Sequence, residues 1–249
     1  MKTLLIGHRG EPEHYPENSL AGFRAVLDAG ARYIETDVQI TADGVAILSH
    51  DPTLLKITEH ELAITETDYR VMRELPAGYA SRFGERFRDL RIARLDELAA
   101  LLQHYPQARA FVEVKHASIK AHGAARVIDL VLEVLGDSRS QCIIISFEPE
   151  ALAHVRDVST LPIGWVLPEW SATSHAIAAE LAPDYLFCNR KRLPPETVPL
   201  WPGPWQWVVY TANEPDEVRA FQARGIDLVE TNVITRLLAE YKAGDTDRG

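Results

Sequence analysis

Short apolar runs alternate along the chain with longer stretches in which apolar residues recur at helical spacing. The runs predict strands, most of them apolar enough to be buried on both faces of a parallel sheet. They cover residues 3–7, 32–38, 110–114, 142–147, 162–167, 184–189, 206–211 and 226–231. The stretches between them predict helices near 20–30, 95–104, 122–135, 149–157, 173–181, 214–224 and 233–242. The eighth connection, at 194–204, is proline-rich and a poor helix candidate, and with it the pattern predicts eight βα units in succession.

This alternation predicts an α/β protein with a parallel sheet, and eight units in 249 residues favour a closed (β/α)₈ barrel of the TIM type. We expect residues 1–249 to form one such domain. The segment 52–91 loses the alternation, because its charges are dense and its glycines and prolines are scattered, and it predicts a small irregular insertion after the second strand region. An open doubly wound sheet is the alternative. Neither a GxGxxG nor a GxxxxGKS/T motif is present, which disfavours dinucleotide and P-loop nucleotide binding.

The segment 32–51 carries the densest candidate chemistry. Glu35 and Asp37 lie two positions apart on a predicted strand, so both carboxylates leave the same face. Two carboxylates this close repel each other unless they share a proton or hold a divalent metal. The next apolar run, VAIL, ends at His50 and Asp51. The segment therefore predicts an acid/base group beside a candidate metal site.

In a barrel of this type the active site lies at the C-terminal ends of the strands. The polar and aromatic residues there are His8, Arg9, Glu35, Asp37, Glu113, Lys115, Ser146, Phe147, Trp165, Asn189, Arg190, Lys191, Tyr210, Asn213, Glu230 and Asn232. Taken singly, many have structural interpretations, such as an ion pair on a strand face or a helix cap. Taken together they suit phosphate ester hydrolysis, because hard carboxylate oxygens bind Mg²⁺ or Ca²⁺, cations pair with phosphate and two histidines can act as base and acid.

The composition narrows the class of partner. With 46% apolar and 25% charged residues the chain is typical of a soluble globular protein, and its net charge of −10 disfavours an extended surface for nucleic acid or anionic lipid. Residues 1–10 hold a run too short for a signal-peptide core, and no stretch is long enough to span a bilayer, so we expect a cytoplasmic protein without stable membrane association. Cys142 and Cys188 fit no metal-ligand or CxxC spacing and predict buried reduced thiols.

Several short motifs then identify a family by their order and spacing. They are HRG at 8–10, PENS at 16–19, ETDV at 35–38, DG at 43–44, SHD at 49–51, EVK at 113–115, SF at 146–147 and YTAN at 210–213. The joint pattern, which extends along most of the chain, resembles the glycerophosphodiester phosphodiesterases of the cytoplasmic bacterial type. The resemblance implies a TIM-type barrel with a small insertion, and the hydrolysis of glycerophosphodiesters to glycerol 3-phosphate and an alcohol.

The resemblance also implies roles for individual residues. Glu35, Asp37 and Glu113 match the ligands of one divalent cation, Mg²⁺ or Ca²⁺, and His8 and His50 match the catalytic histidines. We expect His8 to be the base and His50 the acid. The residues expected to contact the substrate are the cations Arg9 and Lys115, which match the phosphate contacts, and the aromatic residues Phe147 and Tyr210.

The chain departs from the family pattern at two places, and two alternative functions stay open. Lys56-Ile57-Thr58 stands where the family usually has an Arg-Thr pair, and Asn232 stands where aspartate is commoner, so the alcohol part of the substrate is the least defined. A lysophospholipase D-like lyase that forms a cyclic phosphate is one alternative, although the charged segment 52–91 supplies no obvious apolar mouth. A non-catalytic phosphodiester-binding protein is another, although no histidine or carboxylate of the set is damaged. A small-molecule substrate is expected, and a homodimer is compatible with the sequence.

Trp201, Trp205 and Trp207 cluster near the seventh predicted strand. We expect them to pack against the barrel, with an exposed contact surface as the alternative.

Overall fold

The computed structural model describes residues 4–246 and forms a closed parallel barrel. Its strands are β1 (Leu4–His8), β2 (Tyr33–Ile40), β4 (Arg109–Val114), β5 (Cys142–Ser146), β6 (Ile163–Val166), β7 (Tyr185–Asn189), β8 (Gln206–Tyr210) and β9 (Leu228–Thr231). Each pairs in parallel with its neighbour, and β1 pairs with both β2 and β9, which closes the barrel. The predicted (β/α)₈ barrel is confirmed and the open sheet is excluded.

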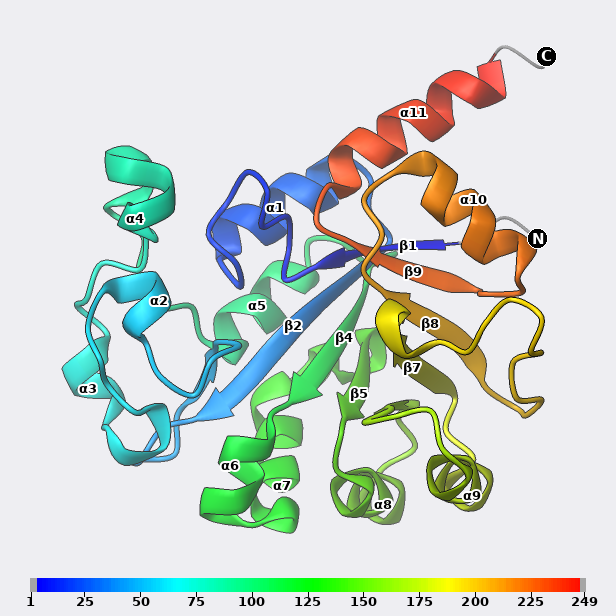
Figure 1. The fold of residues 1–249 in the computed structure, drawn as a ribbon. Coiled ribbons are helices and arrows are strands. Elements are labelled where there is room, and N and C mark those ends of the chain that lie inside the picture. The colour runs from blue at the N-terminus through cyan, green and yellow to red at the C-terminus, as the bar shows by residue number, and fades with distance from the viewer. Residues whose placement is uncertain (1–3, 247–249) are drawn as a thin grey trace.

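Helices cover the outside of the barrel (Figure 1). They are α1 (Leu20–Asp28), α5 (Leu95–Leu102), α6 (His116–His122), α7 (Ala124–Leu135), α8 (Pro149–Val158), α9 (Ala172–Leu181), α10 (Pro215–Ala223) and α11 (Ile234–Thr246), with short 3₁₀ turns η3 (Gly136–Gln141) and η4 (Arg190–Arg192). The helix predicted near 122–135 corresponds to α7, whereas α6, which precedes it, was not predicted. Gly123 separates them at a φ of 86°, a backbone conformation that ends a right-handed helix. Among the described residues, no helix is both long and apolar enough to cross a membrane.

The insertion at 52–91 is more ordered than the sequence predicts. After β3 (Ala46–Leu48), which pairs antiparallel with β2, come α2 (Leu55–Thr58), η1 (Ile64–Glu66), α3 (Tyr69–Met72), α4 (Ala80–Phe83) and η2 (Gly84–Phe87). These short helices stand to one side of the barrel, beyond β2 (Figure 1). They enclose a small hydrophobic core of their own, formed by Ile47, Leu54, Ile57, Ile64, Met72, Ala77 and Ile92. Each helix is about one turn long, so no amphipathic periodicity could reveal it.

The alternation of side chains along each strand decides which residues face the barrel interior. On β2, Ile34 and Val38 pack outward against the helices, so Glu35 and Asp37 point inward. Further from the C-terminal strand ends, the barrel interior is filled by an apolar cluster formed by Ile6, Phe111, Ile143, Ile145, Val166, Phe187, Val208 and Leu228. Two positions further along their strands, the same inward face carries His8, Glu113 and Glu230. The polar side chains therefore meet at the C-terminal end of the barrel.

The tryptophans near β8 pack against the barrel, as predicted. Trp205 and Trp207 are 7% and 5% exposed. Trp170 stacks on the half-buried Trp201 with a centroid distance of 4.0 Å.

Both cysteines are free and fully buried, Cys142 on β5 and Cys188 on β7. Burial raises the pKa of each thiol to about 12. Because the thiolate is the reactive form, we expect neither thiol of the native protein to react with Ellman's reagent between pH 7 and 9, and both to react in guanidinium chloride. The absorbance of the thiolate released from the reagent, read once it is constant, measures the number of reactive thiols. A thiol that reacts at native pH without unfolding would contradict the expectation.

Candidate active site

His8 ends β1 and points into the mouth of the barrel. Its Nδ1 lies 2.8 Å from Oδ1 of Asn232, so Nδ1 carries the proton and donates it to the amide oxygen. The other ring nitrogen, Nε2, is then free to accept a proton. Burial, reinforced by the charge of Arg9, lowers the pKa of His8 to about 3, which keeps the ring neutral near pH 7.

Arg9 follows His8 in a left-handed backbone conformation with a φ of 50°. This conformation directs its backbone N–H to Oε2 of Glu35 at 3.0 Å, while its guanidinium Nε lies 3.0 Å from Oδ2 of Asp37. Nη1 of the same guanidinium lies 3.4 Å from Glu17, whose other oxygen pairs with Lys56 of the insertion. Arg9 therefore links the first strand, the carboxylates of β2 and the insertion.

Three carboxylates converge where β2 and β4 end. Ligand oxygens of Glu35, Asp37 and Glu113 all lie within 4.8 Å of one another. The Nζ atom of Lys115 lies 3.1 Å from Asp37 and 2.8 Å from Glu113. The three residues expected to be metal ligands and one cation expected to contact phosphate therefore lie together, and their roles stay a prediction.

The electrostatics of this cluster leave an excess of negative charge. Burial, followed by repulsion from Asp37, raises the pKa of Glu35 well above its usual range, and burial raises that of Glu113. Although burial acts in the opposite direction, Arg9 and Lys115 hold the pKa of Asp37 below its usual range. A divalent cation would offset the repulsion, and an all-carboxylate set of hard oxygen donors fits Mg²⁺ or Ca²⁺.

Asn18 is a supporting residue whose role the sequence did not show. The neighbouring Ser19 caps α1, since its hydroxyl accepts from the backbone N–H of Gly22 at 3.1 Å. Asn18 instead donates to Oδ2 of Asp37 at 3.0 Å, and its oxygen accepts from the Asp37 backbone N–H at 3.1 Å. Its φ of 57° lies in a region that asparagine tolerates better than most residues.

Replacing Asn18 by alanine is expected to reduce metal affinity or turnover about 10- to 100-fold, because residues that orient metal ligands typically have effects of this size. The reason is the loss of two hydrogen bonds, one from Asn18 to the Asp37 carboxylate and one from the Asp37 backbone N–H to the Asn18 side chain. Calorimetric titration with Mg²⁺ and Ca²⁺ would measure the change. Asn189→Ala, at the opposite side of the mouth, serves as the control for metal affinity, and an Asn18 variant with unchanged affinity and turnover would contradict the role.

His50 reaches the same mouth from the loop after β3. Its Nδ1 lies 2.8 Å from Oδ1 of Asp51, and its side chain is 34% exposed. The buried Gln39 holds this loop in place, because its Nε2 donates to the carbonyl oxygens of Ser49, His50 and Asp51. Gln39 was not singled out in the sequence, because it follows the predicted strand 32–38 and belongs to none of the short motifs.

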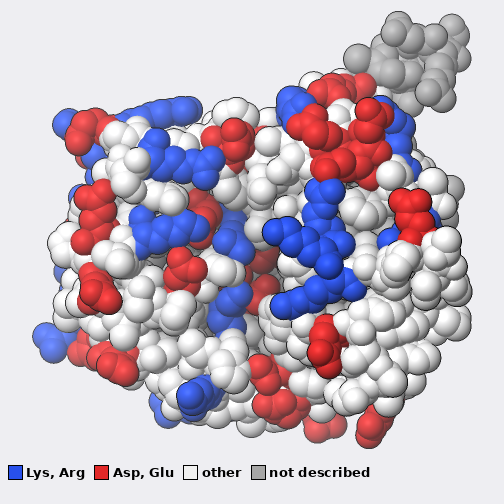
Figure 2. Space-filling view, in the orientation of Figure 1, with Lys and Arg blue, Asp and Glu red and all other residues white. Residues whose placement is uncertain are grey.

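The mouth is a cavity of about 400 Å³. Of the residues with a predicted role, the structure places His8, Arg9, Glu35, His50, Glu113, Lys115, Phe147 and Tyr210 in its lining. Asp37 lies beneath the lining and is 1% exposed. Figure 2 shows lysine and arginine side chains on both sides of a hollow in the middle of this face, with acidic side chains between them.

Of the other residues at the strand ends, some line the cavity and others make hydrogen bonds that hold neighbouring segments in place. Asn189, Arg190, Lys191 and Glu230 line the cavity. Trp165 is buried and donates from Nε1 to the carbonyl oxygen of Phe147 at 3.0 Å, while Ser146 bonds to the backbone of Val114. Asn213 accepts from the backbone N–H of Asn232 at 2.9 Å and so supports the partner of His8.

Comparison with known proteins places the chain among relatives of one kind. It is 39% identical over 102 residues to a glycerophosphodiester phosphodiesterase of Caldanaerobacter subterraneus subsp. tengcongensis, a region that covers 41% of each protein. It is 30% identical over 156 residues to glycerophosphodiester phosphodiesterase 1 of Bos taurus, which covers 62% of this chain and 46% of that protein. The matched regions thus span less than half the length of these curated relatives.

The whole chain also resembles a solved structure. A phosphodiesterase of Oleispira antarctica, solved in complex with the product sn-glycerol-3-phosphate, superposes with a TM-score of 0.84 at 20% identity over 97% of both chains. At this identity the likeness concerns the fold.

Fold and mouth together define a (β/α)₈ barrel protein with carboxylates and cations gathered at its C-terminal strand ends. A model of the glycerophosphoryl diester phosphodiesterase family matches residues 8–236, and the chain belongs to that family.

Proposed function

We propose that the protein hydrolyses glycerophosphodiesters to glycerol 3-phosphate and an alcohol, with one divalent cation, Mg²⁺ or Ca²⁺, held by Glu35, Asp37 and Glu113. The observation that carries this proposal is that His8 and His50 line the same cavity as the carboxylate cluster. Family membership supports it, as does the product named for the Oleispira antarctica neighbour. Side chains that can act as base, acid and ion ligand therefore lie at one cavity.

Each side chain has a defined task in this proposal. His8 accepts a proton from the attacking oxygen at Nε2, since Nδ1 already donates to Asn232. His50 gives a proton to the leaving alcohol. A divalent cation held by Glu35, Asp37 and Glu113 would supply Lewis-acid polarisation of the phosphoryl group. Arg9 and Lys115, which line the cavity, hold the negative oxygens of the phosphate by charge-assisted hydrogen bonds.

The aromatic residues Phe147 and Tyr210 form the less polar side of the cavity, together with Val166 and Phe187. We propose that they contact the carbon skeleton of the substrate. Lys56, one of the departures from the family pattern, pairs with Glu17. Asn232, the other, accepts from His8, so it acts on the base and has no direct part in recognising the alcohol.

The test is release of glycerol 3-phosphate from a panel of glycerophosphodiesters, with Mg²⁺, Ca²⁺ or EDTA present. We expect release that depends on the metal. A cyclic phosphate as the final product would favour the lyase, and binding without turnover across all diesters and metals would favour the binding protein. Phosphorus NMR identifies the product in each case.

We further propose that the protein acts in the cytoplasm on a small molecule and not on nucleic acid. The net charge of −10 argues against binding to nucleic acid, because the cations of the mouth are local and Arg9 and Lys115 are paired with Asp37. Light scattering after size-exclusion chromatography would separate a monomer from a homodimer.

A further inference from the structure

Glu230 has no task in the proposed function, although it occupies a central place in the mouth. It lies on the inner face of β9, is 3% exposed and lines the cavity. Within residues 4–246 its carboxylate accepts no hydrogen bond, and its one ion-pair partner is His8 at 4.0 Å. Because Glu230 faces the cavity, its carboxyl oxygens are open to a hydrogen-bond donor that arrives with the substrate.

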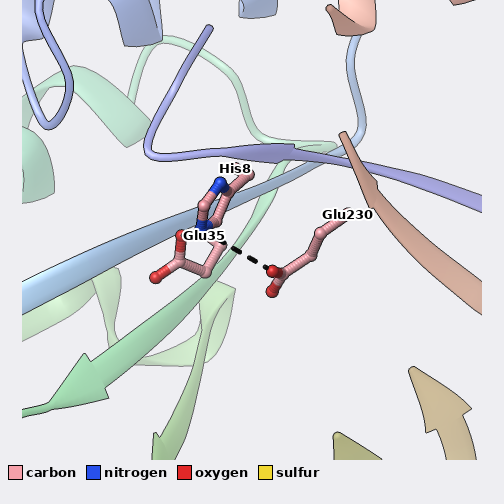
Figure 3. A group of neighbouring side chains, drawn as sticks. All are labelled: His8, Glu35 and Glu230. Carbon is pink, nitrogen blue, oxygen red and sulfur yellow. Dashed lines mark ion pairs between the residues drawn. The ribbon is translucent and has the colours of Figure 1, made fainter. Parts of the chain in front are cut away.

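The distances around His8 leave room for a single oxygen atom. Nε2 of His8 lies 3.9 Å from Oε2 of Glu35 and 4.0 Å from Oε2 of Glu230. Figure 3 shows the three side chains directed toward one another from β1, β2 and β9. Both separations are too long for direct hydrogen bonds, but an oxygen atom between Nε2 of His8 and Oε2 of Glu230 can lie about 2.8 Å from each of these two atoms.

The hydrogen-bonding capacity of these groups selects the kind of oxygen. Nε2 of His8 accepts one proton, because Nδ1 is the donor to Asn232. The carboxylate of Glu230 accepts a second. A water molecule has two protons to donate, whereas a hydroxyl group of the substrate has one.

We propose, on the basis of the proposed function, that Glu230 is a positioning residue that holds the second proton of the attacking water. It thereby favours direct hydrolysis over attack by the 2-hydroxyl of the glycerol moiety. In direct hydrolysis the water oxygen forms a bond to phosphorus while the bond from phosphorus to the alcohol oxygen breaks. One water proton passes to His8, the other remains on the new phosphate oxygen facing Glu230, and His50 protonates the leaving alcohol.

Attack by the 2-hydroxyl has a different proton count. Its single proton passes to His8, the alcohol leaves with a proton from His50, and the product is a cyclic glycerol phosphate. Nothing in that reaction donates to Glu230, so the carboxylate gives no advantage to this route.

The experiment uses Glu230→Met, which removes the acceptor at similar length, and Glu230→Gln, which keeps one acceptor oxygen. Each is assayed on a glycerophosphodiester and on its analogue without the 2-hydroxyl, and phosphorus NMR follows the products. We expect the wild type to hydrolyse both. In Glu230→Met the rate on the analogue, relative to the natural diester, should fall about 10- to 100-fold, as for a lost hydrogen bond to a charged group. Cyclic phosphate should accumulate, and Glu230→Gln should lie between.

Glu11→Gln is the matched control, because Glu11 is 2% exposed but bonds to Thr235 and lies outside the cavity lining. It should leave the product ratio and the rate ratio unchanged. A wild type that cannot hydrolyse the analogue would overturn the inference, because the 2-hydroxyl would then be the nucleophile. An unchanged product ratio and rate ratio in Glu230→Met would also overturn it. So would a calorimetric titration in which the wild type binds two Mg²⁺ ions and Glu230→Met binds one, because Glu230 would then be an ion ligand. A wild type that forms neither product from any diester would overturn the proposed function and this inference with it.

Discussion

Replacement of His50 by alanine is expected to lower kcat about 10²–10⁴-fold on diesters of alkyl alcohols, the usual contribution of a general acid. An alkoxide is a strong base and leaves slowly without a proton, and His50 is the histidine assigned to supply it. The loss should be far smaller on a p-nitrophenyl diester, because p-nitrophenolate leaves without protonation. Steady-state kinetics on both substrates would measure the difference.

His8→Ala provides the complementary result. His8 is assigned as the base and acts on the nucleophile, so the loss of kcat in His8→Ala should be similar for both leaving groups. His154 is a suitable control, since it lies on α8 outside the cavity lining and bonds to Asp129 at 2.9 Å. His154→Ala should keep full activity. If His8→Ala were instead the variant that regains activity on the p-nitrophenyl diester, His8 would be the acid and His50 the base.

Glu35→Gln is expected to abolish most activity, with a fall in kcat/KM of about 10³-fold, because a bound metal contributes several kcal/mol to stabilising the transition state. Glutamine keeps the shape of the side chain and can still accept from the Arg9 backbone, but it removes one of the anionic ligands. The fold should persist, because the charge removed is buried and repelled by Asp37. Calorimetry should show weaker Mg²⁺ or Ca²⁺ binding, and circular dichroism an unchanged melting temperature or a higher one.

The control for this variant is Glu133→Gln, an exposed position on α7. It should bind metal and turn over substrate as the wild type does. Normal turnover by Glu35→Gln in the presence of EDTA would contradict the metal site. Low activity together with normal metal affinity would show instead that Glu35 acts on the substrate.

The barrel was predictable because its signal is local. Each buried strand is an apolar run, and side-chain alternation within a strand requires only the strand itself. Once Ile34 and Val38 face the helices, Glu35 and Asp37 must face inward. The rule that parallel strands of a barrel end at one face then gathers residues from separate strands at one mouth, and His8, Glu113 and Lys115 lie there.

The order within the insertion was not predictable in the same way. Its helices are too short for periodicity, and its core joins Ile47, Met72 and Ile92, which are distant in sequence. Helix α6 was missed for a local reason, since its seven residues, His116–His122, are too few to show a clear helical periodicity.

Local patterns in the chain are enough to predict the fold class, the face that carries the site and the residue types available there, because periodicity and strand ends are properties of short segments. Which of those residues support one another follows from three-dimensional packing. Asn18 meets Asp37 through the loop after β1, and the closing pair β1 and β9 brings Asn232 and Glu230 to His8 from the far end of the chain. Such contacts depend on barrel closure and register, and spacing along the chain does not encode their distances.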